Sequence, residues 1–269
     1  MLGDDSVVDL KRGDNSPEAP VHYSYSQCRT YSMCPQKWYN SKVLKQPQRP
    51  NYNMLSGSAV HVGLEVHNLL RQRGRQGRSA QEVIDSSVAE LESRDDLSEI
   101  GMPAGDAVDQ LVQDITGPVS HYLEHTEAAV WREGDPLLVK VEQEILWEVL
   151  GIPFVGYIDL NPDGAPIVDY KLTKRKKSAG QVESDAQLCI YSQIVGKPAA
   201  FLQLMRGRPI TVYAEQMATS RTIAGVNAWA ESCVAGMEQA RKTGIVQRCQ
   251  PGDWMCTSAQ CEFYHQCYS

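Results

Sequence analysis

A run of turn and strand signals in the middle of the chain limits the possible folds most strongly. Three largely apolar segments, at 137–150, 152–160 and 166–172, have the length and composition of β-strands. Gly151 separates the first two segments, and the turn-forming stretch NPDGAP at 161–166 separates the second from the third. Breaks this short join neighbouring antiparallel strands. The sequence therefore predicts a hairpin and a third strand in one sheet.

Segments with helical periodicity lie on both sides of these strands. We expect two short helical stretches within 24–44, because Ser24 and Ser26 are possible N-caps and Cys34-Pro35 breaks the segment. The other expected elements are, in chain order, helices at 56–74, 79–92 and 107–129, a helix at 183–195, strands at 199–205 and 210–214, and a helix at 219–244. This order predicts an α/β fold with a mixed central sheet, flanking helices and a mostly helical N-terminal part.

The chain of 269 residues is long enough for one large domain. We expect a polar, mobile lead at 1–22 and one domain at 23–269, divided into a helical region at about 56–130, the sheet at about 137–215 and a cysteine-rich tail at about 249–269. No apolar run approaches the roughly 18–20 residues needed to cross a bilayer, and the start of the chain lacks a secretion signal. We therefore expect a cytoplasmic protein that makes no membrane contact.

Two acids and a lysine stand in the predicted strands. Asp169 and Lys171 are two residues apart, so their side chains share one face of a strand. Asp159 ends the preceding strand and approaches Asp169 if the two strands pair. Carboxylates this close repel each other unless a cation or a proton lies between them, and Mg²⁺ or Mn²⁺ suits such ligands. The alternative is a solvated hairpin end with one salt bridge.

Four further side chains could join this site. His61 lies on the expected helix at 56–74, behind small residues that would let the helix approach the sheet, and Glu65 follows one turn later. Gln187 and Tyr191 share one face of the helix after the third strand and could contact a phosphate or a base. Each of these residues, taken alone, is as easily explained as a packed or surface residue.

The order of these motifs resembles the RecB-type branch of the PD-(D/E)XK nuclease superfamily. The motifs are G-x-x-x-H, G-Y-I-D, D-x-K and Q-x-x-x-Y, which supply Gly57 and His61, Asp159, Asp169 and Lys171, and Gln187 and Tyr191. The resemblance runs from about residue 24 to the C-terminus. It implies a restriction-endonuclease-like fold and a metal-dependent nuclease.

The resemblance also implies roles for single residues. His61, Asp159 and Asp169 would be metal ligands, and the backbone carbonyl of Tyr170 would add another. Lys171 would be the catalytic lysine, and Gln187 and Tyr191 would belong to the catalytic group. Asp169 stands where many members have glutamate. Glu142 and Glu144, on the first predicted strand, are further contenders for the site, although we favour a structural or surface role for both.

The chain has eight cysteines, and several of them are clustered at its end. In a reducing compartment, clustered cysteines more often bind metal than form disulfides. Cys256, Cys261 and Cys267 have the spacing C-x4-C-x5-C, and Cys34 lies far upstream. The chain is similar here to iron–sulfur nucleases of the RecB type, including CRISPR-associated adaptation nucleases and AddB-type helicase–nucleases. That resemblance implies a [4Fe–4S] cluster on Cys34, Cys256, Cys261 and Cys267.

Other arrangements of the cysteines stay open. Zn²⁺ could be held by the three tail cysteines and His265. Cys28 or Cys249 could replace Cys34 as the fourth ligand of a cluster. Cys189 and Cys233 lie on expected helices and are interpreted as core residues.

These features predict a deoxyribonuclease, an exonuclease on single-stranded DNA ends. The net charge of −7 does not exclude a nucleic-acid ligand and fits a confined basic channel better than a broad basic surface. Lys174–Lys177 could draw in a DNA backbone. Tyr191, Tyr31 or Trp38 could stack on unpaired bases. The alternatives are a non-catalytic DNA-binding or assembly module on the same fold, and a sequence-specific endonuclease. Partner proteins in recombination or CRISPR adaptation, phage DNA processing, and a homo-oligomer are compatible with the sequence.

Overall fold

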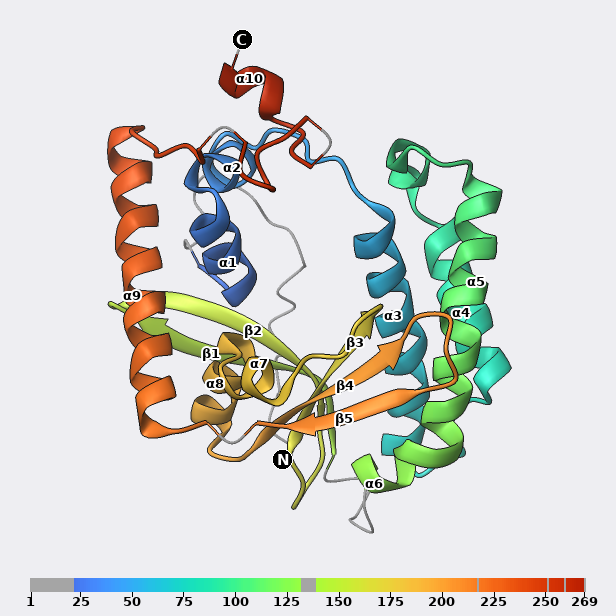
Figure 1. Ribbon diagram of the computed structural model, residues 1–269. Helices are drawn as coiled ribbons and strands as arrows, with labels where there is room; N and C mark the ends of the chain where they lie inside the picture. The colour runs from blue at the N-terminus through green and yellow to red at the C-terminus, as the bar shows by residue number, and fades with distance from the viewer. Residues whose placement is uncertain (1–21, 132–138, 217, 251, 259, 269) are drawn as a thin grey trace, which may run out of the picture.

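The computed structural model describes residues 22–131, 139–216, 218–250, 252–258 and 260–268. The expected mobile lead falls outside this part of the chain, except for its last residue. A five-stranded sheet lies between two groups of helices, and Figure 1 shows α3, α4 and α5 on one side of it and α8 and α9 on the other.

The sheet has its strands in chain order, from β1 to β5. Its strands are β1 (Lys140–Val149), β2 (Ile152–Asn161), β3 (Ile167–Thr173), β4 (Ala199–Met205) and β5 (Thr211–Glu215). Neighbouring strands are antiparallel except β3 and β4, which are parallel. The parallel pair requires a crossover connection, which the helices α7 (Ala179–Glu183) and α8 (Ala186–Val195) provide. The predicted mixed sheet flanked by helices is confirmed.

The turn between β1 and β2 explains their regular pairing. Leu150 and Gly151 both have positive φ, at 54° and 74°. Two consecutive left-handed residues are typical of a two-residue hairpin turn whose twist matches that of the strands. This turn sets one register from Val149–Ile152 to Lys140–Asn161. The register matters below because it decides which side chains face each other.

Several of the remaining helices begin or end at a residue that suits a helix terminus. The remaining helices are α1 (Tyr25–Met33), α2 (Pro35–Trp38), η1 (Tyr39–Val43), α3 (Tyr52–Gln72), α4 (Ala80–Glu92), η2 (Asp95–Ile100), α5 (Ala104–His121), η3 (Tyr122–Thr126), α6 (Glu127–Trp131), α9 (Ser220–Thr243) and α10 (Tyr264–Tyr268). Ser24 and Ser79 cap α1 and α4 by accepting hydrogen bonds from the first-turn backbone. Gly244 ends α9 in the left-handed conformation.

Two helical segments differ from the predicted ones. The helix expected at 183–195 begins at Ala186, as α8, because Asp185 accepts hydrogen bonds from the backbone of Gln187 and Leu188, and the short helix α7 precedes it. The helix expected at 107–129 begins earlier, at Ala104, and passes through the π-helical turn η3 into α6. The strand bounds differ from the predicted ones by at most a few residues.

Apolar side chains pack on both faces of the sheet. On one face, buried residues of α3 to α6 pack against Leu160, Val168 and Leu202 of the strands. On the other face, α7, α8 and α9 pack against Ile158 and Phe201. The middle strands are thus buried on both sides, which holds the residues at their ends in fixed positions. Among the described helices, none is both long and apolar enough to span a membrane.

Candidate active site

The candidate site lies where β2 and β3 separate. These two strands pair at Leu160 and Val168. Further along β3, side chains take the places that backbone groups of β2 would occupy. The backbone N–H of Tyr170 donates to Asp159 Oδ2 at 2.6 Å, and Tyr170 O lies 2.9 Å from His61 Nε2. The site is therefore an opening in the sheet whose backbone groups are satisfied by an imidazole and a carboxylate.

His61 comes from α3 and contacts both strands at the opening. Its Nδ1 lies 3.2 Å from Asp159 Oδ1, while its Nε2 reaches Tyr170 O. Burial lowers the pKa of His61, but the neighbouring Asp159 carboxylate more than offsets this and raises the pKa to about 9. With no cation bound, the imidazole is therefore charged near neutral pH and donates from both nitrogens, and it would lose a proton on binding a metal ion. The predicted approach of His61 to Asp159 is present in the structure.

Asp169 and Lys171 form the second half of the site. Lys171 Nζ lies 2.6 Å from Asp169 Oδ2, and Gln187 Nε2 donates to Asp169 Oδ1 at 2.8 Å. Burial and the Asp159 charge raise the pKa of Asp169 to about 6, against the opposing effect of Lys171. Burial lowers the pKa of Lys171, but the two carboxylates raise it above its ordinary value. Lys171 is thus a charged ammonium on a half-buried side chain.

The helix α8 supports the Asp169 carboxylate through two residues. Gln187 Nε2 also donates to Tyr191 OH at 3.3 Å, so the predicted pair of side chains on α8 is connected. A side chain at Gly156 would place its Cβ 2.9 Å from the Tyr191 ring. Gly156 therefore lets Tyr191 pack against β2. Glycine within a strand often marks such a close approach, and this signal was present in the motif G-Y-I-D.

Two of the three aromatic residues expected to stack on bases are buried. These are Trp38 and Tyr191, whereas Tyr31 is half-buried and makes an edge-to-face contact with Trp38. Trp38 donates its ring N–H to Gln27 and belongs to the core between α1, η1 and α9. Base stacking on Trp38 or Tyr191 is therefore wrong for this structure, because apolar packing already covers both rings.

Glu142 lies closer to the site than the sequence indicated. The register on either side, Val141–Leu160 and Gln143–Ile158, puts Glu142 opposite Asp159. One ligand atom each from His61, Glu142 and Asp159 lie within 4.8 Å of one another. The structural or surface role favoured for Glu142 is therefore not supported. The tight hairpin turn after β1 is the feature of the sequence that could have predicted this position, because the turn sets which residue of β1 faces Asp159.

The donors at this opening suit a hard divalent cation. Imidazole nitrogen, carboxylate oxygens and the Tyr170 carbonyl are ligands that Mg²⁺ or Mn²⁺ accepts. Asp169 Oδ2 is buried, and its contact among the described residues is the ion pair with Lys171 at 2.6 Å. A carboxylate oxygen with one such partner still has a lone pair for a second positive group. The residues present therefore fit such an ion.

The basic segment after β3 is smaller than its sequence suggests. Lys174, Arg175 and Lys176 are exposed. Lys177 instead pairs with Asp185 and lies over the Phe201 ring, 4.4 Å from its centre. Three cations of the predicted four are thus available to a ligand beside β3.

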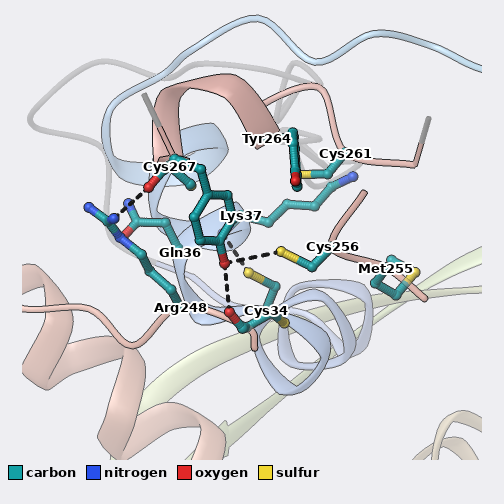
Figure 2. Close-up of a pocket in the computed structure, with 11 residues that line it drawn as sticks. Cys34, Gln36, Lys37, Arg248, Met255, Cys256, Cys261, Tyr264 and Cys267 are labelled. Carbon is teal, nitrogen blue, oxygen red and sulfur yellow. Dashed lines mark hydrogen bonds between the residues drawn. The ribbon is translucent and has the colours of Figure 1, made fainter. Parts of the chain in front are cut away.

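A second candidate site joins the tail to the first helices. Figure 2 shows Cys34, Cys256, Cys261 and Cys267 around one pocket, which Cys249 also lines. Cys34 comes from the junction between α1 and α2. Four or more thiols around one pocket fit a thiolate-ligated metal group.

The alternative metal ligands considered from the sequence, His265, Cys28 and Cys249, lie at different distances from this pocket. His265 is exposed and does not line the pocket, so the arrangement of Zn²⁺ on three cysteines and His265 lacks its fourth donor there. Cys28 is buried beside Cys233 between α1 and α9, away from this pocket. Cys249 does line it, and its Sγ donates to Met33 O at 2.7 Å.

Comparisons with known proteins agree with this architecture. The family profile described as "PD-(D/E)XK nuclease superfamily" matches residues 22–268. A comparison with curated proteins found no match. The structure of a protein described as "Putative exonuclease" from Eubacterium rectale is similar, with a TM-score of 0.56 and 12% identity, over 86% of this chain and 86% of that chain. The structure of SSO0001 matches over 75% of this chain and 83% of that chain, with 14% identity and a TM-score of 0.33.

The profile covers nearly all of the described residues, including both sides of the opening between β2 and β3 and the cysteine-rich tail. The likeness to the Eubacterium rectale protein, at its low identity, shows a shared fold. The chain therefore belongs to the PD-(D/E)XK nuclease superfamily.

Proposed function

We propose that this chain is a metal-dependent deoxyribonuclease that acts as an exonuclease on single-stranded DNA ends. The observation that carries the proposal is the convergence of His61, Asp159, Asp169 and Lys171 around the Tyr170 backbone. His61 and Tyr170 are 109 positions apart in the chain, so this convergence is a product of the fold. A nuclease of this superfamily needs a cation site beside an ammonium, and this arrangement supplies both.

The protein groups have separate tasks in this proposal. His61, Asp159, Asp169 and the Tyr170 carbonyl hold a Mg²⁺ or Mn²⁺ ion, which supplies charge stabilisation to the scissile phosphate. Lys171 orients the attacking water and places a positive charge beside the phosphate. Gln187, supported by Tyr191, keeps Asp169 in the position that Lys171 needs. Lys174, Arg175 and Lys176 attract the DNA backbone toward this opening.

Single-stranded ends are the proposed substrate for two reasons. The basic surface next to the site is a short exposed segment on one loop, which suits a narrow backbone track. The similar structure from Eubacterium rectale is described as a "Putative exonuclease". A duplex-reading protein would need a broader basic face or a separate target-reading domain.

We further propose that the cysteine pocket holds a structural [4Fe–4S] cluster on Cys34, Cys256, Cys261 and Cys267. The pocket lies between the α1–α2 junction and the tail, so a group bound there joins the two ends of the domain. No three of these cysteines, all of which are described, have sulfur atoms within 4.8 Å of one another. This spacing suits a group larger than one tetrahedral zinc ion with Zn–S bonds of about 2.3 Å.

The test of the nuclease proposal is cleavage of DNA labelled at either end, in Mn²⁺ or Mg²⁺ and in EDTA. We expect loss of product in EDTA, and a loss of at least about a hundredfold in Lys171→Ala and Asp169→Ala. Lys242→Ala is the matched control, because Lys242 is exposed at the end of α9. Circular dichroism checks that each variant is folded. Single-stranded DNA labelled at its 5′ or 3′ end then gives the polarity of digestion.

Two results would contradict the proposal. Cleavage by Lys171→Ala at the rate of the unmodified protein would show that this ammonium is not catalytic. DNA binding without metal-dependent cleavage would instead favour the second candidate, a non-catalytic DNA-binding or assembly module.

A further inference from the structure

The opening between β2 and β3 contains a carboxylate that the proposed ligand set leaves out. Glu142 lies on β1 and offers a carboxylate oxygen within 4.8 Å of ligand atoms of His61 and Asp159. Among the described residues, these three make up the group of histidine, cysteine and acidic side chains that is close enough to hold one ion. Asp169 stands apart from it, engaged with Lys171 and Gln187.

We propose that Glu142 is a ligand of the divalent cation, together with His61 and Asp159. This inference rests on the proposed metal-dependent function and extends it by one residue. A histidine and two carboxylates are a mixed donor set for a cation such as Mn²⁺ or Mg²⁺.

The backbone at Glu142 supports this inference. Glu142 has a φ of 47°, a left-handed conformation that residues other than glycine seldom adopt. The regular β1–β2 ladder continues on both sides, at Val141–Leu160 and Gln143–Ile158, and is interrupted between Glu142 and Asp159. A local distortion of a strand re-aims a side chain, and such distortions are frequent beside active sites. Here the re-aimed carboxylate faces the acid of the G-Y-I-D motif.

The charges at this position also need a cation. Like charges directly opposite on paired strands destabilise a sheet. Glu142 and Asp159 are opposite by register, and His61 and Lys171 lie beside the acids of this opening. A divalent cation bound by Glu142 and Asp159 would offset the repulsion between these two acids.

Glu144 provides an internal comparison on the same strand. It lies two residues along, is exposed, and accepts a hydrogen bond from Tyr157 OH at 3.0 Å. It is absent from the group formed by His61, Glu142 and Asp159. Its removal changes the net charge of the strand as much as removal of Glu142 does, so it separates ligation from a general charge effect.

The experiment measures Mn²⁺ binding to the purified full chain by calorimetry and by the Mn²⁺ electron paramagnetic resonance signal. We expect Glu142→Gln to raise the Kd for Mn²⁺ by about tenfold or more. We also expect Glu142→Asp to raise the Kd, because it keeps the charge but withdraws the carboxylate by one methylene. Glu144→Gln should stay within about twofold of the unmodified protein, because an exposed charge is screened. Asp159→Asn should lose most of the binding.

Each outcome decides between the two proposals. Unchanged Mn²⁺ binding in both Glu142→Gln and Glu142→Asp would overturn the inference, while Asp159-dependent binding and cleavage in the unmodified protein would leave the proposed function standing. An equal loss in Glu144→Gln and Glu142→Gln would also overturn the inference, because only total charge would matter. Binding that does not depend on Asp159 would overturn the proposed function and the inference together. If Glu142→Gln does not fold, Glu142→Asp decides the question.

Discussion

At the scale of single residues, the site is made by side chains that replace a missing strand neighbour. Asp159 accepts the hydrogen bond from the Tyr170 N–H, and His61 contacts the Tyr170 carbonyl. Both groups of Tyr170 are thereby satisfied without closing the sheet, which a buried backbone requires. The same carbonyl stays at the opening, where it can act as a ligand. The backbone groups of Tyr170 are thus hydrogen-bonded, while the side chains beside them can still bind a metal ion. The proposed chemistry depends on this local arrangement.

The protonation of His61 predicts how stability changes with pH in EDTA. Its pKa is raised from 6.5 to about 9 in the folded protein, mainly by Asp159 against the effect of burial. The charged imidazole therefore contributes stability that is fully present below about pH 6.5 and is lost as pH rises through about 9. We expect the difference in free energy of unfolding between the unmodified protein and His61→Gln to shrink between about pH 6 and about pH 9.5.

Urea unfolding of both proteins at several pH values measures this difference. Titrating groups away from His61 contribute equally to both proteins, so their contributions cancel in the difference. A difference that stays constant, or grows toward high pH, would show that His61 is not held in its charged form.

At the scale of elements, the position of α3 depends on Gly63, a glycine that is not part of the G-x-x-x-H motif. A methyl group at Gly63 would lie 2.6 Å from Val83 O and 2.4 Å from Ser87 Oγ on α4. A methyl group at Gly57, the glycine of the motif G-x-x-x-H, would meet no atom within 4 Å. The close approach that small residues allow is thus between α3 and α4 at Gly63, and it fixes the helix that carries His61.

This contrast predicts opposite effects of one substitution at two positions of the same helix. Gly63→Ala should lower the free energy of unfolding by about 1–3 kcal/mol, because backbone of α4 would have to move. Gly57→Ala should raise it by about 0.5–1 kcal/mol, because alanine favours the helix more than glycine does. Thermal or urea unfolding of both variants checks the prediction. Equal effects at the two positions would mean that the helices are not in this close contact.

At the scale of the whole molecule, the tail is tied to the first helices by polar contacts and cysteines. Lys37 on α2 pairs with Glu262 at 2.9 Å, and Cys249 Sγ donates to Met33 O on α1 at 2.7 Å. The tail contributes few buried apolar side chains, of which Phe263 is one. A metal group bound to the cysteines would therefore supply much of the order of this region.

The proposed [4Fe–4S] cluster predicts that the purified protein is coloured and that its thermal stability depends on bound iron. Protein purified without oxygen should be brown, with broad absorption near about 400 nm. Cys261→Ser should lose the iron and lower the Tm, since the tail would lose its link to Cys34. Cys189→Ala is the control, because Cys189 is buried on α8 outside the pocket and should keep full iron content. A colourless protein with one equivalent of zinc would contradict the cluster.

The elements of this chain could largely be predicted because they depend on near neighbours in sequence. The strand at 199–205 was predicted with the bounds that β4 has, and Gly244 was predicted to end the long helix. Apolar periodicity, turn glycines and capping side chains act within a few residues, so they are readable from the order of residues alone. The spacing of the motifs likewise indicated the superfamily, and with it the approach of His61 to Asp159.

Tertiary structure alone decided which of these residues share a site and which are used elsewhere. Glu142 faces Asp159 because of the hairpin register and its own left-handed backbone conformation. Lys177 instead forms an ion pair with Asp185 and packs over the Phe201 ring. Such choices depend on the distances between segments far apart in the chain. Short-range periodicity carries no information about those distances, because they follow from how the faces of the sheet and helices pack.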